Sequence, residues 1–437
     1  MTRDSTIRRI DARRVWDSRG RPTVEAEVTL AGGAVGRAIA PAGASRGERE
    51  AIELRDGGSF CGGYGVARAL ASVAEVIAPA LVGLDAADQA GVDATLIMLD
   101  GTANKARLGG NATIAVSMAV AHAAAAAGGV PLWRHLAGDG GGGVVRMPMP
   151  MVQIFGGGAH AGRRIDVQDF LVMPLCADSF DAATEVVAEV YHAAGALMSE
   201  TGRLAGVADE GGWWPQFDGN EAALEAAVAA IERAGLRPGT DVALAVDVAA
   251  SQFWDGTLYR LAADGAALDT GALIDRLAGW CTAYPVVSLE DPVHEGDTAG
   301  MAEVTRRLGD RVQIVGDDFL ATSAQAVERA ARGGACNAAL IKPNQAGTLT
   351  ETLAALDAAR AAGMRTIVSA RSGETEDVTI VHLAVGWGAD QLKVGSFARS
   401  ERMAKWNEAL RIEAALGPAA GFAGRDAVGG RARPKAA

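Results

Sequence analysis

The sequence has little lysine. Of its 41 basic residues only five are lysines: Lys105, Lys342, Lys393, Lys405 and Lys435. Arginine stays protonated under ordinary conditions, whereas a lysine can lose its proton when its surroundings lower its pKa. A position that remains lysine in an arginine-rich chain therefore indicates a need that arginine cannot meet.

Cysteine is also scarce, and its spacing excludes two kinds of site. The four cysteines lie far apart, without a C-x-x-C pair: Cys61, Cys176, Cys281 and Cys336. This pattern is typical neither of a disulfide framework nor of a zinc site, so we expect reduced, small core residues of a cytoplasmic protein. The first residues, MTRDSTIRRIDARR, carry charge but no apolar run, so we expect no signal peptide.

The chain also has fewer basic than acidic residues, 41 against 53. A net charge of −12 argues against nucleic acid and anionic membrane surfaces as partners. It leaves open a small anionic substrate, which senses only the local field of its pocket. The most membrane-like run, Ala112–Val130, is rich in Ala and Gly and contains His122, so we expect a packed interior helix.

The chain is long enough for two domains. It has 437 residues, 49% of them hydrophobic. Residues Thr6–Leu30 predict a strand, a turn and a strand, to which Ala34–Ile39 would pair. Helical patterns follow at Val66–Leu81, Ala90–Leu99 and Ala112–Ala127. We predict an N-terminal α+β domain over residues 1–138, a linker-like GDGGGG run, a second domain over residues 144–423, and a disordered tail over residues 424–437.

The second domain repeats one pattern, in which a short apolar strand ends in a residue able to do chemistry and a helix follows. The strand-end residues are Asp247, Glu290, Asp291, Asp317, Asp318, Lys342, Arg371, Ser372 and Lys393. Alternating strands and helices predict an α/β fold, and in a closed βα barrel the carboxyl ends of the strands face one mouth. Polar residues that merely mark strand ends are the alternative, but carboxylates on three consecutive strands followed by lysines fit it poorly. We therefore predict a metal and acid–base site at the barrel mouth.

Three loops add candidate residues. The loop PAGASRGERE contains Ser45 and Arg46, and its backbone N–H groups could face an anion or simply form a surface loop. A glycine-rich turn precedes His160, which is either a structural histidine or a site residue. Glu210 lies in DEGGWW, where burial would raise the pKa of its carboxyl group towards that of a general acid.

Segments along the whole chain resemble the enolase family. The matching stretches are DSRGRPTVE, GASRG, LDGTANKARLG, GGGAHA, DEGG, SLEDP, GDD, IKPNQAGTLTET, RSGETED and ARSERMAKWN. The resemblance implies an enolase-type, TIM-barrel-like βα barrel whose second strand and first helix run against the usual direction. It also implies a homodimer or a larger ring.

The resemblance also implies roles for single residues. It makes Asp247, Glu290 and Asp317 ligands of one Mg²⁺, with Ser45 reaching a second that arrives with the substrate; these are the hard oxygen donors that Mg²⁺ prefers. A Lys base with Mg²⁺ ions stabilising the enediolate is the general scheme of the enolase superfamily. The implied catalytic residues are the base Lys342, the charge-stabilising Lys393, the acid Glu210 and its acidic partner Asp169. The implied substrate-binding residues are His160, Gln168, Arg371 and Ser372.

Four positions depart from the family pattern. Ala370 stands where the pattern has a pocket histidine, and Arg46 stands beside Ser45 where it has threonine. Asp169 replaces a glutamate, and Val394 replaces a threonine. The metal ligands and both catalytic lysines are intact, so the lyase chemistry is expected to be retained while the pocket wall has changed.

These departures favour a modified substrate. Ala370 frees space, and Arg46 offers a bidentate site for a further carboxylate or phosphonate. We therefore expect dehydration of a carboxyphosphono analogue of 2-phosphoglycerate to carboxyphosphonoenolpyruvate, as in phosphinate natural-product biosynthesis. The alternatives are an ordinary glycolytic enolase that makes phosphoenolpyruvate and a non-catalytic binding protein of the same fold.

Overall fold

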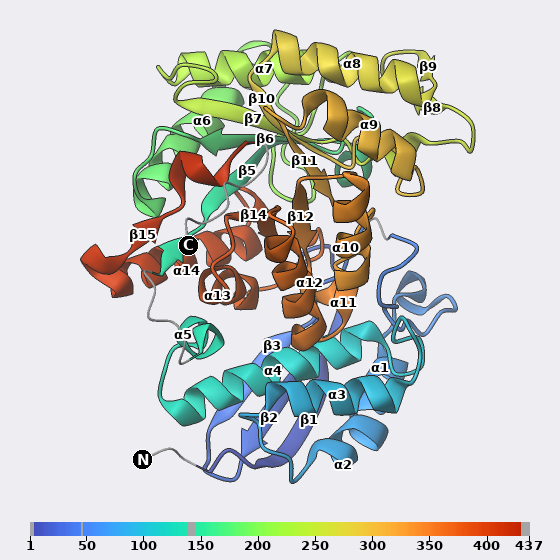
Figure 1. Cartoon of the computed structure of the whole chain (residues 1–437), viewed down its shortest axis with the longest axis vertical. Coiled ribbons are helices and arrows are strands. Elements are labelled where there is room, and N and C mark those ends of the chain that lie inside the picture. Colours follow the sequence, from blue (N-terminus) through green and yellow to red (C-terminus); the bar gives the residue numbers. More distant parts are fainter. Residues whose placement is uncertain (1–3, 45–46, 139–144, 430–437) are drawn as a thin grey trace.

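A three-stranded antiparallel sheet forms the base of the first domain (Figure 1). The computed structural model describes residues 4–44, 47–138 and 145–429. The strands β1 (Ile7–Trp16), β2 (Pro22–Leu30) and β3 (Val35–Ile39) pair in that order, as predicted. Asp17 closes the first turn, because its carboxylate accepts hydrogen bonds from the backbone N–H groups of Arg19 and Arg21.

Helices cover one side of this sheet. The helix α4 (Gly110–Gly128) packs on β2 and β3, and it can approach because a Cβ at Gly36 would collide with the backbone of Ala119 and Ala123. By length and composition α4 could span a membrane, but 89% of its apolar window is buried inside the protein, so the prediction of a packed helix is confirmed. The other helical elements here are η1 (Phe60–Gly63), α1 (Ala67–Ser72), η2 (Val73–Ile77), α2 (Ala78–Leu81), α3 (Gln89–Asp100) and α5 (Leu132–Ala137).

Eight strands close into a barrel in the second domain, which confirms the predicted fold class. Their apolar runs are continuous because each strand is buried on both faces, between the barrel interior and the outer helices. Around the barrel the strands are β5 (Met149–Gly156), β6 (Asp169–Pro174), β7 (Val242–Asp247), β10 (Val286–Glu290), β11 (Gln313–Gly316), β12 (Ala338–Ile341), β13 (Arg365–Ser369) and β14 (Gln391–Ser396).

The second barrel strand runs against the others, as expected. β6 is antiparallel to both β5 and β7. The connection from β5 to β6 holds only the short η3 (Gly158–Ala161) and no crossover helix, which parallel strands would need. The helix α6 (Phe180–Glu200) therefore starts from the opposite end of the barrel, and α7 (Asn220–Arg233) brings the chain back to the start of β7.

The remaining helices surround the barrel (Figure 1). The first five return the chain to the start of the next barrel strand, and the sixth leads into the C-terminal segment. They are α8 (Thr270–Ala283), α9 (Thr298–Leu308), α10 (Ala324–Gly333), α12 (Leu349–Ala361), α13 (Thr379–Gly386) and α14 (Ser400–Leu416). Shorter elements are η4 (Ala250–Phe253), α11 (Pro343–Ala346) and the hairpin of β8 (Tyr259–Leu261) and β9 (Ala266–Leu268).

The C-terminal segment closes the far end of the barrel. After η5 (Gly417–Ala419), the strand β15 (Gly421–Phe422) pairs with β4 (Arg146–Met147), and η6 (Gly424–Ala427) follows. Ala423 and Ala427 are buried in the apolar cluster inside the barrel, and the side chain of Gln391 donates a hydrogen bond to the carbonyl of Ala427. The expectation of disorder from Gly424 is therefore wrong for residues 424–429. Residues 430–437, like the expected linker at residues 139–144, lie outside the described part.

Two histidines meet where the domains join. His122 of α4 and His382 of α13 pack edge to face, with ring centroids 6.3 Å apart. The Nε2 atom of His122 lies 2.8 Å from the hydroxyl oxygen of Thr379, and Nε2 of His382 lies 3.4 Å from a carboxylate oxygen of Glu408 in α14. Both rings thus form part of the interface between the first domain and the barrel.

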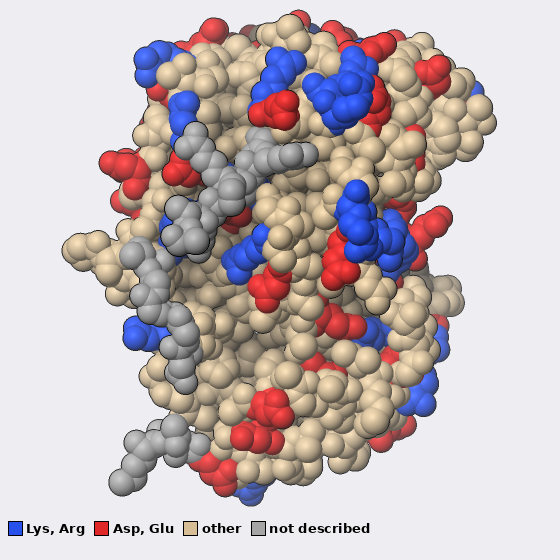
Figure 2. Space-filling model, in the orientation of Figure 1, with Lys and Arg blue, Asp and Glu red and all other residues tan. Residues whose placement is uncertain are grey.

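The cysteines are free, but they are not all core residues. Cys336 is buried, Cys61 and Cys281 are partly exposed, and Cys176 is exposed. The expectation of small core residues is therefore wrong for Cys176, which follows the end of β6 at the far end of the barrel. On the face in Figure 2, acidic and basic side chains are interspersed over both domains.

Candidate active site

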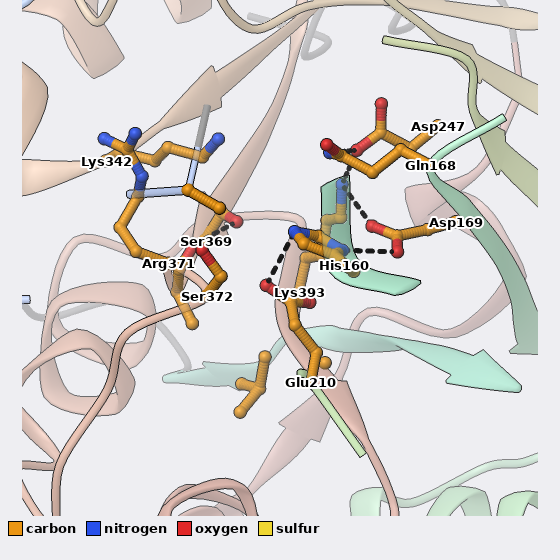
Figure 3. A pocket seen from close by; sticks show the side chains of 14 residues that line it. His160, Gln168, Asp169, Glu210, Asp247, Lys342, Ser369, Arg371, Ser372 and Lys393 are labelled. Atoms are coloured by element: carbon orange, nitrogen blue, oxygen red, sulfur yellow. Dashed lines mark hydrogen bonds and ion pairs between the residues drawn. The ribbon is translucent and has the colours of Figure 1, made fainter. Parts of the chain in front are cut away.

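The carboxyl ends of the barrel strands bring the predicted residues together at one mouth of the barrel, around the pocket in Figure 3. Asp247 and Glu290 end β7 and β10, Asp317 and Lys342 directly follow β11 and β12, and Lys393 lies in β14. All five are buried, with at most 8% of their surface exposed. The pocket is lined by Ala44, His160, Gln168, Asp169, Glu210, Asp247, Lys342, Ser369, Ala370, Arg371, Ser372, Lys393, Val394 and Gly395.

Lys393 bridges two of the three predicted metal ligands. Its ammonium group lies 2.8 Å from Oδ2 of Asp247 and 2.7 Å from Oε2 of Glu290. Gln168 donates a further hydrogen bond of 2.9 Å to the same Asp247 oxygen. Burial alone would lower the pKa of Lys393, but the surrounding carboxylates, Asp247 first, hold it well above its usual value.

Lys342 pairs with the third predicted ligand. Its Nζ donates to Oδ2 of Asp317, and the side chain of Gln345 donates to the other oxygen of that carboxylate at 3.0 Å. Burial lowers the pKa of Lys342, yet Asp317 outweighs burial and the net shift is upwards. The amine predicted to act as base therefore lies directly against the predicted metal ligands, and in this arrangement it is protonated.

The three ligands fit a hard divalent cation. They offer only carboxylate oxygens, which Mg²⁺ prefers. Oε1 of Glu290 is buried and has no hydrogen-bond partner among the described residues, so it is an acceptor without a donor. Burial and the neighbouring Asp247 charge raise the pKa of Glu290 well above its usual value, which a bound cation would reverse.

A second acidic group lies next to these ligands. Ligand atoms of Asp291, Asp317 and Asp318 lie within 4.8 Å of one another. The Asp291 carboxylate accepts hydrogen bonds from the backbone N–H groups of Asp317 and Asp318, at 2.9 and 2.8 Å, so it already shapes the end of β11. Burial together with the Asp317 charge raises the pKa of Asp291 to about 8 and that of Asp318 to about 9.

His160 lies between the two carboxylates on the other side of the pocket. Its Nδ1 is 2.9 Å from Oδ1 of Asp169, and its Nε2 is 3.7 Å from Oε1 of Glu210. Gln153 also donates to Asp169, and no described hydrogen bond joins Asp169 to Glu210 directly. Burial lowers the pKa of His160, but Asp169 and Glu210 overcome it and raise the value to about 9. His160 is therefore an imidazolium at neutral pH.

The expected pKa of Glu210 is wrong in direction. Burial does raise it, as predicted, but the positive charges of His160, Arg402, Lys393 and Lys342 together lower it below its usual value. Glu210 is thus a carboxylate in this arrangement. Asp169 behaves differently, because burial keeps its pKa raised against the pull of His160.

Arg371 and Ser372, the predicted phosphate binders, line one side of the pocket. Arg371 is buried and pairs with Glu50 of the first domain, with Nη1 2.9 Å from Oε2. Glu50 also accepts hydrogen bonds from the side chain of Gln345 and from the backbone N–H of Gly47. The hydroxyl of Ser372 accepts a hydrogen bond of 3.3 Å from Arg19. Two residues of the first domain therefore hold the predicted phosphate binders.

Three of the four positions that differ from the family pattern lie in the described part of the chain. Ala370 and Val394 line the pocket, and Asp169 lies in its wall. Ser45 and Arg46 lie outside the described residues, but Ala44 before them lines the pocket and Gly47 after them approaches Asp318. The sequence did not single out Glu50, Arg19 and Gln345. Their motifs were recognised, but nothing in a single chain indicates that these residues contact the pocket from another domain or loop.

The lysine pattern has a structural counterpart. All four described lysines are buried, and each has a carboxylate partner. Besides the two in the pocket, Lys105 pairs with Glu351 across the domain boundary at 2.9 Å, and Lys405 pairs with Glu374 at 3.0 Å. On the surface of the described chain, positive side-chain charge is therefore carried by arginine and not by lysine.

Two family models together match nearly the whole chain. The model of the enolase N-terminal domain matches residues 7–136. The model of the enolase C-terminal TIM barrel domain matches residues 144–430. Both matches coincide with the two domains of the fold.

Proposed function

The chain belongs to the enolase family of Mg²⁺-dependent lyases, and from that premise we propose that it eliminates water from a 2-phosphoglycerate-type substrate. The observation that carries the proposal is the contact of Lys342 with Asp317, which puts a candidate base directly against the metal ligands. Asp247, Glu290 and Asp317, with Ser45 for a second ion, would hold Mg²⁺, which supplies charge neutralisation for a dianionic enolate.

The proton is removed from the carbon that bears the carboxylate. Lys342 can take this proton only as a neutral amine, so its own ammonium proton must be lost first. This loss requires the ion pair between Lys342 and Asp317 to break. Lys393 keeps its proton throughout, because three carboxylates surround it, and it faces the negative charge that develops on the substrate carboxylate. The two lysines thus have opposite protonation states in the reacting enzyme.

The hydroxyl group leaves from the neighbouring carbon as water. The C–O bond breaks as Glu210 gives a proton to the departing oxygen. Glu210 is a carboxylate in this structure, so it must first receive that proton, and the imidazolium of His160 lies 3.7 Å away. We propose that His160 supplies it and that Asp169 orients the ring through Nδ1.

The pocket wall supports a modified phospho group. Arg371 and Ser372 would bind the phosphoryl oxygens, and Ala370 lies directly before them where a histidine would fill space. We propose that this space and Arg46 accept a further carboxylate on phosphorus. The substrate would then be 2-phosphonoformylglycerate and the product carboxyphosphonoenolpyruvate. We also propose that the enzyme works as a homodimer or larger homo-oligomer.

An absorbance assay for the enol product tests the proposal. Purified protein with Mg²⁺ should turn over the phosphonoformyl substrate faster than 2-phosphoglycerate, and EDTA should stop both reactions. Glu210→Gln is the matched control that keeps the fold but removes the acid. The double substitution Ala370→His and Arg46→Thr should shift preference towards 2-phosphoglycerate by about tenfold or more.

Other outcomes separate the alternatives. Faster turnover of 2-phosphoglycerate than of the analogue would identify an ordinary enolase and remove the modified substrate. No turnover of either substrate in the presence of Mg²⁺ would favour a non-catalytic binding protein. An unchanged preference in the double variant would mean that these two positions do not set selectivity.

A further inference from the structure

Helix α14 carries a buried guanidinium group to which the proposed mechanism gives no direct role. Arg402 has no exposed surface. Its Nη1 donates hydrogen bonds to the carbonyl oxygens of Arg371 at 2.7 Å and Val394 at 2.9 Å, and its Nη2 donates to that of Ser372 at 2.6 Å. The carboxylate of Glu401 lies 3.6 Å from Nε, beyond hydrogen-bond distance. Arg402 thus uses backbone carbonyls, not an acid, as its hydrogen-bond partners.

These carbonyls need a donor because two strands separate here. β13 and β14 pair as far as Ser369 and Lys393, and the N–H of Ala370 makes one more bond to the carbonyl of Lys393. Beyond this point the chain turns into the pocket, and buried carbonyls without donors would be costly. A planar guanidinium can satisfy three at once with fixed geometry, whereas a lysine ammonium offers no such fork.

The same side chain lies behind Glu210. Gly395 separates them, because a Cβ at this position would lie 3.0 Å from Cβ of Glu210 and 3.1 Å from Cδ of Arg402. The backbone N–H of Ser396 donates to the carbonyl of Glu210 at 2.9 Å and fixes it to β14. Only a residue without a side chain lets both groups pack against this strand.

Several charged groups face Glu210 from other elements. They are His160 of η3, Asp169 of β6, Lys342 after β12 and Lys393 of β14. Among the cations that lower the pKa of Glu210, Arg402 ranks after His160 and ahead of both lysines. His160 and Lys342 change their protonation during the proposed reaction. Arg402 does not, because a guanidinium keeps its charge.

We propose that Arg402 is a positioning residue: it fixes the Arg371–Ser372 turn that binds the phospho group and places a permanent positive charge behind Glu210. The inference rests on the proposed function for the roles of Arg371, Ser372 and Glu210. The geometric part concerns anion binding alone and does not depend on turnover. The two parts can therefore be tested separately.

The test compares Arg402→Met and Arg402→Lys with Lys105→Met. Lys105 is a matched control, because it is also a buried cation, but it pairs with Glu351 and makes no described hydrogen bond to the Arg371–Ser372 turn. The first measurement is the dissociation constant of inorganic phosphate with Mg²⁺, by titration calorimetry. The second is the pH profile of kcat/KM, in which the limb that disappears in Glu210→Gln reports Glu210.

Both Arg402 variants should bind phosphate about tenfold more weakly or worse, because misplaced binding groups lose affinity steeply. In Arg402→Met the Glu210 limb should move up by about one pH unit, since a nearby positive charge is lost. Arg402→Lys should restore the limb but not the phosphate affinity. Lys105→Met should lower the melting temperature and change neither readout.

Other results overturn the inference. Unchanged phosphate affinity in both Arg402 variants, with a lower melting temperature, would reduce Arg402 to a structural residue. If Arg402→Met does not fold, Arg402→Lys decides the positioning role alone. If the parent protein turns over neither substrate, the proposed function fails, and the phosphate titration still decides whether Arg402 positions an anion site.

Discussion

Acidification should weaken the contact between the two domains through His382. This ring is buried in α13 against His122 of α4, and its Nδ1 has no hydrogen-bond partner among the described residues. Burial, reinforced by His122, lowers the pKa of His382 to about 4 against the opposing charge of Asp377. The carboxylate of Glu408, 3.4 Å from Nε2, also opposes this shift, but it is partly open to solvent.

The magnitude follows from the two pKa values. An unfolded histidine titrates near pH 6.5, so between there and about pH 4 the native state binds fewer protons than the unfolded state. Stability is therefore present above pH 6.5 and falls as the pH drops through this window. At about 1.4 kcal/mol per pKa unit, the limit is about 3 kcal/mol, of which about 2 kcal/mol is lost between pH 7 and pH 5.

Urea unfolding at pH 7 and pH 5, followed by tryptophan fluorescence, measures this loss. The variant His382→Gln cannot titrate, so its unfolding free energy should fall by about 2 kcal/mol less than that of the parent over this interval. His192→Gln, at an exposed position on α6, is the control and should behave like the parent. An identical pH dependence in His382→Gln and the parent would refute the reasoning.

Two further predictions concern catalysis and packing. Lys342→Arg keeps the charge but removes a base that can be deprotonated, so turnover in the absorbance assay should fall by at least about 10³-fold, and retained turnover would contradict the assigned role. Gly36→Ala should lower the unfolding free energy by about 3 kcal/mol or more in urea, because the new Cβ collides with the α4 backbone, whereas Gly333→Ala, with open space around it, should not.

The sequence predicted those parts of the site that follow from local pattern. Strands that end in Asp247, Glu290 and Asp317 necessarily present these carboxylates at one mouth once the barrel closes. The positions of Lys342 and Lys393 follow in the same way. Each of these residues needs only the direction of its own strand to be placed.

Properties that depend on neighbours from elsewhere could not be predicted. Burial of Glu210 was foreseen, but the four cations that reverse its effect come from η3, the residue after β12, β14 and α14. Glu50 and Arg402 contact the pocket residue Arg371 from the first domain and from the last long helix. The C-terminal segment has few apolar residues, and its order depends on a cavity inside the barrel that Ala423 and Ala427 fill.

The burial of the four described lysines has a practical consequence at the bench. Reagents that acylate or cross-link primary amines find none of these side chains on the folded surface, and only Lys435 and the α-amino group lie outside the described residues. Extensive amine labelling of this protein would thus count unfolded molecules instead of folded ones. Coupling to a support or a dye should use other chemistry, such as the exposed thiol of Cys176.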